Sequence, residues 1–414
     1  MKITTLTPDE NGLVAWPTLS AHKRTVLTIG VFDGMHRGHQ AVIARVVELA
    51  RKTGSLAVAM VLSPRPALAH RYANEHDGMD LPDGAADTEA LSSVEQRLRI
   101  MEAMGVDQVL VVRYTMAFAA KSFRFFLGQM VGKLGMRTLV LGKDAALGAG
   151  RAGDIKAISA LADATRVFEL DVVDDLGPGD TWIPSHIEPR MPEGIGEPKD
   201  PTEGMSKAER RAWSKANQCR KVRVWSSSNV RYLLSQGRVR DAAAVLGHDH
   251  AVEGVVVHGE QRGREIGFPT ANLAQKVEGY VPVDGVYAGW LVDLGPADDG
   301  KDGEGTGSGV RNGDDTAVSA APDDRARMAK GSPWRWPAAI SIGTKPTYSD
   351  ETGIAERVIE PYCVTDDWLE LYGHKVRVEF TRFLRGQVKF AGTDELKVAL
   401  KDYADQTLAI TGAQ

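Results

Sequence analysis

The chain has 414 residues, of which 43% are hydrophobic and 25% are charged, and its 50 basic and 55 acidic side chains leave a net charge of −5. This composition excludes a fibrous or generally disordered protein, and the length predicts two or more domains. The acidic balance argues against a nucleic acid as the main partner.

The first part of the chain alternates strand-like and helical segments. A buried strand at 25–30 precedes a helical pattern at 39–51. Five strands separated by helices predict an α/β domain with a doubly wound parallel sheet, whose ligands gather at the carboxyl ends of the strands. The remaining elements are a strand at 56–62, a helix opened by the capping-box pattern of Ser92 and Glu95, strands at 106–112, 137–142 and 166–173, and helices at 123–134 and 154–164.

The second part of the chain has a different pattern of predicted secondary structure. Residues 174–218 form a Pro/Gly-rich excursion, expected to be a loop with one short helix, and residues 222–247 read as a strand and two short helices. From Val252 onward, short alternating segments follow one another without long helices. This pattern predicts a mainly antiparallel β-barrel or sandwich, on whose outside a final helix at 393–410 packs.

An insertion separates two of the expected barrel strands. Residues 294–333 are rich in Gly, Asp, Ser and Ala, and we expect them to be a disordered hairpin loop. The predicted domains are therefore 1–222, a linking pair of helices at 223–248, and 249–414.

The stretch GVFDGMHRGHQ, residues 30–40, places His36 and His39 in a glycine-containing turn that enters a helix. Gly38 lets the backbone approach a ligand, and the free N–H groups of the helix start attract a phosphate. Two imidazoles there can donate hydrogen bonds to a phosphorus centre as negative charge builds on its oxygens. Two alternatives stay open: a metal pair, for which no third ligand follows at a recognisable spacing, and two surface histidines at a helix start.

This stretch resembles the first signature of the nucleotidyltransferases with an HxGH motif, in the form found in the adenylyltransferase module of bacterial bifunctional riboflavin kinase/FAD synthetases. The second signature of that family, SSTxxR, is similar to SSSNVR at residues 226–231, although a plain helix cap would explain the serines alone. The resemblance implies that His36 and His39 are catalytic. It also implies that ATP is bound by Gly30, Phe32, Asp33, Gly34, Gly38, Ser226, Ser227 and Arg231.

Two segments depart from the family pattern. Residues 62–66 read LSPRP where the family commonly shows FDPHP, and residues 142–148 read GKDAALG where it shows GxDFxFG. Asp144 is retained there, and the resemblance implies that it contacts the flavin. The lost side chains leave an alternative open, in which the first domain is a degenerate nucleotide- or flavin-binding regulator of a riboflavin kinase.

A short segment at residues 204–207, Gly-Met-Ser-Lys, is similar to the KMSKS loop that accompanies an HIGH motif in class I aminoacyl-tRNA synthetases. The acidic balance and the lack of a basic anticodon-binding region argue against that family. Matches this short are common by chance.

A second candidate site is the stretch REIGFPTANL, residues 264–273, preceded by Gly263. Side chains alternate along a strand, so Thr270 and Asn272 share one face, where a hydroxyl and an amide oxygen can hold Mg²⁺. A proline-led edge strand with polar residues facing water would show the same pattern.

The pattern GRxxGFPTAN resembles the hallmark of riboflavin kinases, and the segments at 285–290, 340–348, 358–364 and 371–390 agree with that family in order. The resemblance implies that Glu360 is the catalytic base. It further implies that ATP is bound by Gly263, Arg264 and Gly267, the flavin by Tyr287, and the metal by Thr270 and Asn272.

The sequence thus predicts a bifunctional enzyme of FAD biosynthesis. Its second domain would phosphorylate riboflavin with ATP, and its first domain would adenylylate FMN to FAD and release pyrophosphate, both with Mg²⁺. No signal-peptide core, apolar span or CxxC pair is found, which favours a cytoplasmic protein without a membrane partner. The partners expected are the small-molecule substrates riboflavin, FMN and ATP, and a homo-oligomer stays open.

Overall fold

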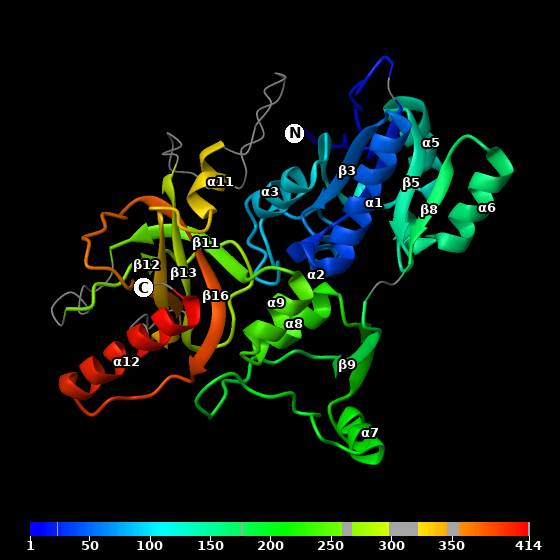
Figure 1. The fold of residues 1–414 in the computed structure, drawn as a ribbon. Helices are drawn as coiled ribbons and strands as arrows, with labels where there is room; N and C mark the ends of the chain where they lie inside the picture. The colour runs from blue at the N-terminus through cyan, green and yellow to red at the C-terminus, as the bar shows by residue number, and fades with distance from the viewer. Residues whose placement is uncertain (23, 175–176, 259–266, 298–321, 346–355, 413–414) are drawn as a thin grey trace. The chain divides into compact units, whose positions relative to one another are not determined.

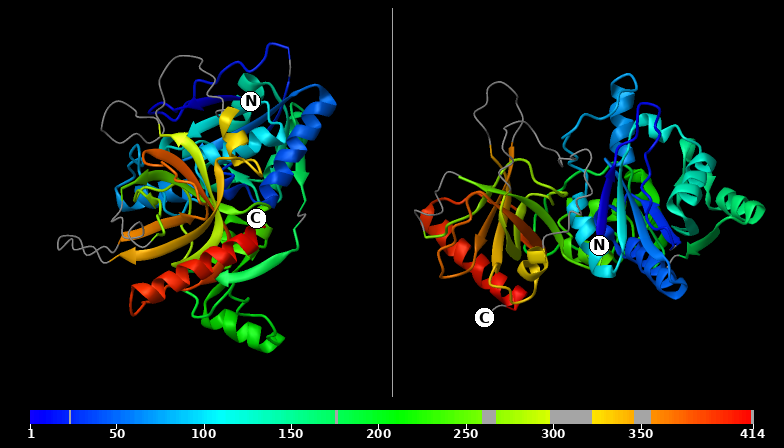
Figure 2. Two further views of the ribbon diagram at one scale, coloured as in Figure 1. Left: turned by 60° about the vertical axis from the view of Figure 1, so that its left-hand side comes forward. Right: turned by 90° about the horizontal axis from the view of Figure 1, so that it is seen from above.

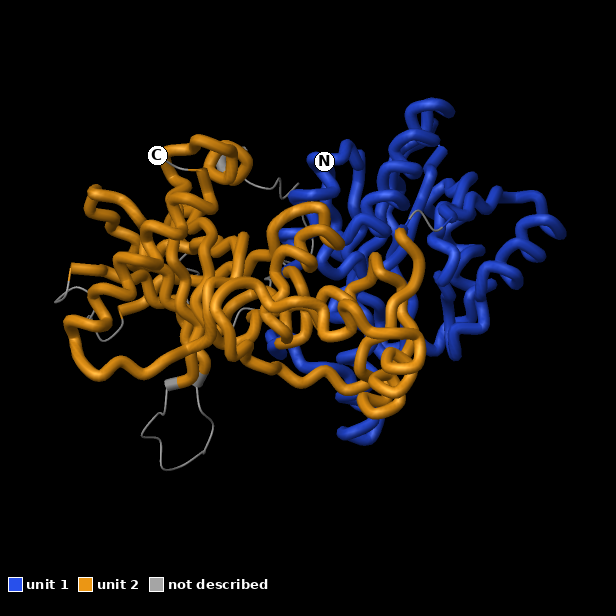
Figure 3. The backbone as a smooth tube through the Cα atoms, turned by 60° about the horizontal axis from the view of Figure 1, so that its bottom comes forward, with its two compact units in different colours: residues 1–87, 93–177, 300–320 blue, residues 88–92, 178–299, 321–414 orange. Residues whose placement is uncertain are grey.

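The computed structural model describes residues 1–412 except 23, 175–176, 259–266, 298–321 and 346–355. The chain divides into two compact units (Figure 3). The first contains the described residues of 1–87 and 93–177, and the second contains those of 88–92, 178–299 and 321–414. No helix among the described residues is both long enough and apolar enough to cross a bilayer.

The first unit is a doubly wound α/β domain, as predicted. Its six parallel strands lie in the order β1-β4-β3-β2-β5-β8, of which β3, β5 and β8 are labelled in Figure 1. The sequence predicted five of these strands and missed the edge strand β1, because only Leu6 of KITTL is buried and the segment shows no apolar run. The strands are β1 Lys2–Leu6, β2 Thr25–Gly30, β3 Leu56–Ser63, β4 Gln108–Arg113, β5 Met136–Gly142 and β8 Glu169–Val173.

Helices cover both faces of this sheet. Alternate strand residues feed two separate cores, because successive side chains point to opposite faces. One core contains Leu27 and Met60 with residues of α5 and α6, and the other contains Val26 and Val61 with residues of α1 and α3. The helices are α1 Arg37–Thr53, α2 Pro66–Glu75, α3 Val94–Met104, α4 Met116–Ala119, α5 Phe123–Leu134 and α6 Ile155–Thr165, and a small ribbon pairs β6 Ala146–Leu147 with β7 Gly153–Asp154.

The capping box of α3 lies one residue later than predicted. Ser93, not Ser92, is the N-cap: its Oγ accepts the N–H of Gln96, and the Gln96 side chain accepts the N–H of Ser93, both at 3.2 Å. Ser92 is buried instead, and Glu95 lies within the first turn, where its charge favours the helix start.

The excursion expected at 174–218 is more ordered than a loop. It contains β9 Asp180–Pro184, which the sequence analysis missed, and α7 Lys207–Ala216. Strand β9 pairs antiparallel with β10 Cys219–Arg223, and the two predicted short helices follow as α8 Ser227–Ser235 and α9 Val239–Leu246.

Residues 188–200 of the excursion lie along elements of the second unit. Glu197 accepts the backbone N–H of Arg240 at 2.7 Å and that of Phe383 at 3.2 Å, and the Gly196 N–H donates to Leu384. Because of these bonds, residues 188–200 belong to the second unit. The first unit therefore ends at residue 177, whereas the sequence predicted a domain boundary at 222.

The rest of the second unit is a nearly closed antiparallel barrel, with strand order β12-β11-β16-β13-β14-β15. A bridge between Thr270 and Tyr362 joins the strands at the two ends of this order, and the Ala271 N–H donates to the Pro361 carbonyl at 2.9 Å. The strands are β11 His250–Val257, β12 Asn272–Leu273, β13 Gly285–Pro296, β14 Arg335–Lys345, β15 Glu356–Cys363 and β16 His374–Arg385.

Helix α12, Thr393–Thr411, packs on the outside of the barrel as predicted (Figure 2). Its Tyr403 is buried against Val286, Ala339 and Leu384 of three strands, which point away from the barrel interior.

The structure describes both ends of the insertion predicted at 294–333, and both contain regular secondary structure. Strand β13 runs to Pro296, and helix α11 occupies Pro322–Met328. Arg327 of α11 donates to Asp293 at 3.1 Å and lies over the Trp334 ring. Residues 298–321 lie outside the described part of the chain.

Candidate active sites

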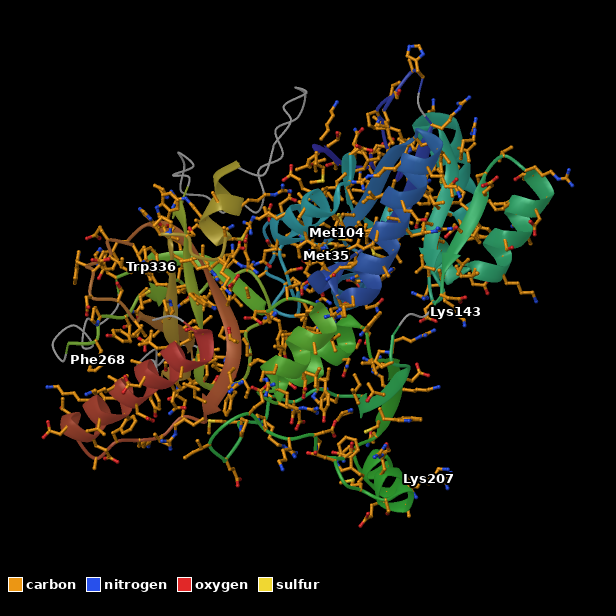
Figure 4. All side chains as sticks on the ribbon, in the orientation of Figure 1. Met35, Met104, Lys143, Lys207, Phe268 and Trp336 are labelled. Atoms are coloured by element: carbon orange, nitrogen blue, oxygen red, sulfur yellow. The ribbon has the colours of Figure 1, made fainter. Side chains whose placement is uncertain are left out.

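The first site is the turn that joins β2 to α1. Phe32, Gly34 and Met35 have φ values of 55°, 75° and 44°, in the left-handed region that side chains other than glycine rarely adopt. Phe32, Asp33 and Met35 are nevertheless buried (Met35 is labelled in Figure 4), so packing holds the turn in this conformation. Gly30 fits closely beneath it, because a Cβ there would lie 3.2 Å from the Phe32 ring.

His36 caps α1, so the helix begins two residues earlier than predicted. The His36 Nδ1 accepts the N–H of His39 at 3.4 Å, and the neutral ring must therefore carry its proton on Nε2. The two imidazoles are stacked with their centroids 3.6 Å apart, and the Phe32 ring stands edge-on to His39 at 5.4 Å.

Burial lowers the pKa of His39 well below its ordinary value, and the neighbouring His36 and Arg97 lower it further. His39 is therefore neutral at pH 7. Its Nδ1 is buried and has no hydrogen-bond partner among the residues that the structure describes. An unsatisfied buried nitrogen is costly, and a bound oxygen would satisfy it.

The local structure fits a phosphate better than a metal. Helix α1 has 17 residues, and Gly38 lies in its first turn, where free N–H groups and the positive end of the dipole attract an anion. No group of three His, Cys, Asp or Glu side chains is placed to hold a metal in the described ranges of the chain. The alternative of two surface histidines does not fit either, because His36 is only 7% exposed and the Nδ1 atom of His39 is buried.

Ser226, Ser227 and Arg231 belong to the second unit. Ser226 is the N-cap of α8: its Oγ accepts the N–H of Asn229 at 3.2 Å and donates to the Arg223 carbonyl at 2.8 Å. Ser227 begins the helix, and Arg231 donates through Nε to the Glu89 carbonyl at 2.6 Å. The serine cap is thus a structural feature in its own right.

The two segments that depart from the family pattern follow β3 and β5. Arg65, in the first, makes a two-pronged ion pair with Asp87 at 2.5 Å and is 8% exposed. In the second, Asp144 is exposed in the turn next to Lys143 (labelled in Figure 4), and its carbonyl accepts Arg151 at 3.4 Å. Ala145 and Leu147 pack against the core of the first unit.

The barrel brings together three of the residues expected to serve a kinase. Continuing the register of the bridge between Thr270 and Tyr362 places Asn272 opposite Glu360. Residues directly opposite on antiparallel strands point to the same face. Asn272 is 8% exposed, and its Nδ2 donates to the Thr270 carbonyl at 3.4 Å, which leaves Oδ1 as a ligand for a cation.

Two further residues extend this row, and the motifs did not reveal them. Ser341 of β14 is the register partner of Glu360 on the other side of β15. Gln387 donates through Nε2 to Ser341 Oγ at 3.0 Å and to the Ile342 carbonyl at 2.8 Å. Asn272, Glu360, Ser341 and Gln387 therefore form a polar row across neighbouring strands, which we call the barrel row.

The loop before β12 is described from Gly267 onward. Gly267 has φ 88° and is exposed, while Gly263 and Arg264, expected to bind ATP, lie outside the described residues. The Phe268 ring (labelled in Figure 4) stands edge-on to Tyr362 at 5.2 Å and fixes the approach to Thr270.

Tyr287, expected to bind the flavin, occupies the barrel core. It has no exposed surface, its hydroxyl donates to the Val283 carbonyl, and its ring stands edge-on to Phe380 and Phe383. A side chain that is enclosed and already hydrogen-bonded supports the packing, so we place Tyr287 in the core and not in a flavin site.

Known proteins resemble the chain over most of its length. The family model described as FAD synthetase matches residues 18–187, and the one described as riboflavin kinase matches residues 246–411. The bifunctional riboflavin kinase/FMN adenylyltransferase of Escherichia coli K12 is 28% identical over 376 residues, covering 91% of this chain and 89% of that protein. The enzyme of the same name from Bacillus subtilis is 26% identical over 373 residues, covering 90% and 88%.

A crystal structure described as a macrolide-efflux protein from Streptococcus pneumoniae has a similar fold. It covers 97% of this chain and 98% of its own, with a TM-score of 0.65 and 20% identity. At that identity the likeness shows the fold alone.

Proposed function

The chain belongs to the family of bifunctional riboflavin kinase/FAD synthetases, and on that premise we propose which of its residues carry out the two reactions. The barrel phosphorylates riboflavin to FMN, and the α/β domain adenylylates FMN to FAD. The alternative of a degenerate first domain is not favoured, because both family models match and the histidine turn is intact.

In the kinase reaction, Glu360 is the base. It accepts the proton of the ribityl 5′-hydroxyl as that oxygen forms a bond to the γ-phosphorus of ATP, and the bond from that phosphorus to the β-phosphate oxygen breaks to release ADP. Thr270 and Asn272 would hold Mg²⁺, which neutralises charge on the phosphates. The observation that carries this assignment is the barrel row, in which the register places Asn272 and Ser341 on either side of Glu360.

In the adenylyl transfer, the phosphate of FMN attacks the α-phosphorus of ATP, and the bond to the β-phosphate oxygen breaks to release pyrophosphate. The neutral His36 and His39 rings and the first turn of α1 donate hydrogen bonds to the phosphate oxygens, where negative charge develops. Ser226, Ser227 and Arg231 are proposed to bind ATP phosphates, and Asp144 to contact the flavin. Each of these four assignments is supported by the family pattern only.

We place both reactions in the cytoplasm, where ATP is abundant. One assay tests the whole assignment: purified protein is supplied with riboflavin, ATP and magnesium, and FMN, FAD and pyrophosphate are followed. The double variant His36→Ala, His39→Ala should form FMN but no FAD. The variant Glu360→Ala should form no FMN but should still convert supplied FMN to FAD. FAD formation undiminished in the double variant would refute the role of the histidines.

A further inference from the structure

A buried arginine outside both signatures lies against the histidine turn. Arg97 of α3 is 4% exposed, and its Nη1 donates to the Val31 carbonyl at 2.7 Å while its Nε donates to the Ser93 carbonyl at 3.0 Å. One guanidinium therefore ties the first residue after β2 to the N-cap of α3. Both bonds use the fixed geometry of the guanidinium, which an ammonium group does not have.

The turn needs such a tie. Val31 directly precedes Phe32, and Phe32 and Met35 both adopt left-handed backbone conformations, which are unfavourable for a residue other than glycine. Met35 packs in one core with Leu98 and Met101 of α3, so α3 supports the turn from beneath while Arg97 holds its carbonyl.

We propose that Arg97 is a positioning residue for adenylyl transfer: by fixing the Val31 carbonyl it holds the strained turn that presents His36 and His39. This inference rests on the proposed function of the first unit. Arg97 need not touch either substrate, because it acts through the backbone of residues 31–36.

The positive charge of Arg97 also affects the histidine turn. The charged groups that influence Arg97 are Asp33 and Glu95 near the turn and the ion-paired Arg65 and Asp87. Burial lowers the pKa of Arg97, and Asp33 and Glu95 partly offset that effect. The cation in turn contributes to the lowered pKa of His39, and so helps to keep that ring neutral.

Three full-length variants test the proposal. Arg97→Lys keeps the charge but cannot make both hydrogen bonds, and Arg97→Gln removes the charge as well. The matched control is Arg99→Gln, since Arg99 is also buried on α3 but points about 200° away around the helix. The measurements are kcat and KM for FAD formation, with riboflavin phosphorylation by the same chain as a control for the second unit.

We expect Arg97→Lys and Arg97→Gln to lower kcat for FAD formation about 100-fold, because small displacements of reacting groups have effects of that size. KM for ATP should change less than about threefold, and FMN formation should be unaffected. Full activity of Arg97→Lys would overturn the positioning role, as would a loss no larger than that of Arg99→Gln.

A second measurement does not depend on catalysis. The imidazole resonances of His36 and His39, followed by NMR in wild type and Arg97→Lys, report the turn directly. Altered shifts of both rings are expected, and unchanged shifts would overturn the proposal. If the wild-type chain forms no FAD, the proposed function fails, and these spectra still decide whether Arg97 positions the turn.

Discussion

The two sites are built in opposite ways. In the first unit, the two histidines and the turn that presents them come from consecutive residues between Gly30 and His39. In the second unit, the barrel row draws Asn272, Ser341 and Glu360 from three strands and Gln387 from the segment after a fourth. The first site is therefore marked by one continuous motif, whereas the barrel row exists only while the strand register is kept.

The largest expected effect breaks the second site and leaves the first intact. Glu360→Gln removes the base without changing the size of the side chain, and we expect kcat for riboflavin phosphorylation to fall about 1,000-fold. FAD formation from supplied FMN should stay within about twofold of wild type. The control is Glu370→Gln, since Glu370 is an exposed carboxylate shortly after the same strand. Unchanged FMN formation in Glu360→Gln would contradict the base assignment.

The reverse experiment breaks the first site. His39→Ala removes a hydrogen-bond donor to the phosphate oxygens, and we expect FAD formation to fall about 100-fold with FMN formation unchanged. His36→Asn separates capping from chemistry, because asparagine is a good N-cap. It should keep the stability of α1 and still lose FAD formation. The exposed His22 provides the control His22→Ala, and equal losses in His22→Ala and His39→Ala would argue against a specific role.

The contrast between a continuous motif and a site assembled from several strands also explains how much of the structure the sequence could predict. The parallel sheet, the helices at 123–134 and 154–164 and the barrel all followed from apolar periodicity, which is a local property. The histidine turn could be predicted because its glycines and histidines are contiguous in the sequence and follow a strand. Strand β9 was missed because its five residues, DTWIP, bury only Ile183 fully and end in proline.

Ser341 and Gln387 could not be found in this way. Ser341 matters only because β14 pairs with β15 in the register that places it beside Glu360, and Gln387 matters only because the chain after β16 returns to β14. Tyr287 was misplaced for the same reason: its segment resembles the family, but the alternation along β13 turns this side chain into the core.

Two histidines with lowered pKa values differ in their hydrogen bonding, and for His250 the lowered pKa predicts how stability depends on pH. His250, in the barrel, has its Nε2 2.6 Å from the Tyr280 carbonyl, whereas His39 Nδ1 has no partner in the described part of the chain. Burial is the main cause that lowers the pKa of His250 from 6.5 to about 4. The unfolded chain therefore binds a proton as the pH falls below 6.5 while the folded chain does not, so stability falls with the pH.

The slope is about 1.4 kcal/mol per pH unit, and we expect a loss of about 2 kcal/mol between pH 6.5 and 5. Urea unfolding of wild type and His250→Gln at both pH values measures it, and the variant should lose less stability than wild type over this range. The half-buried Glu197 and Asp249, whose pKa values burial raises, act in the opposite direction as the pH falls. Equal pH dependence of the two proteins would show that His250 does not carry the effect.

The smallest expected effect tests whether the barrel row reaches Gln387. Its amide N–H groups bond Ser341 Oγ and the Ile342 carbonyl, and its backbone N–H lies 3.3 Å from Met191 Sδ, a contact that side-chain replacement leaves in place. Gln387→Glu removes both side-chain donors at constant size, so the Ser341 hydroxyl would turn its proton toward the new carboxylate and away from the face it shares with Glu360.

One hydrogen bond is worth about 1 kcal/mol, so we expect kcat for FMN formation to fall about fivefold, with KM for riboflavin and FAD formation from supplied FMN unchanged. Gln406→Glu, on the outer helix α12, is the control. A rate in Gln387→Glu equal to that of the control would confine the kinase site to Asn272, Glu360 and Ser341. A fivefold loss would instead show that a site assembled by strand register extends to a residue that no motif marks.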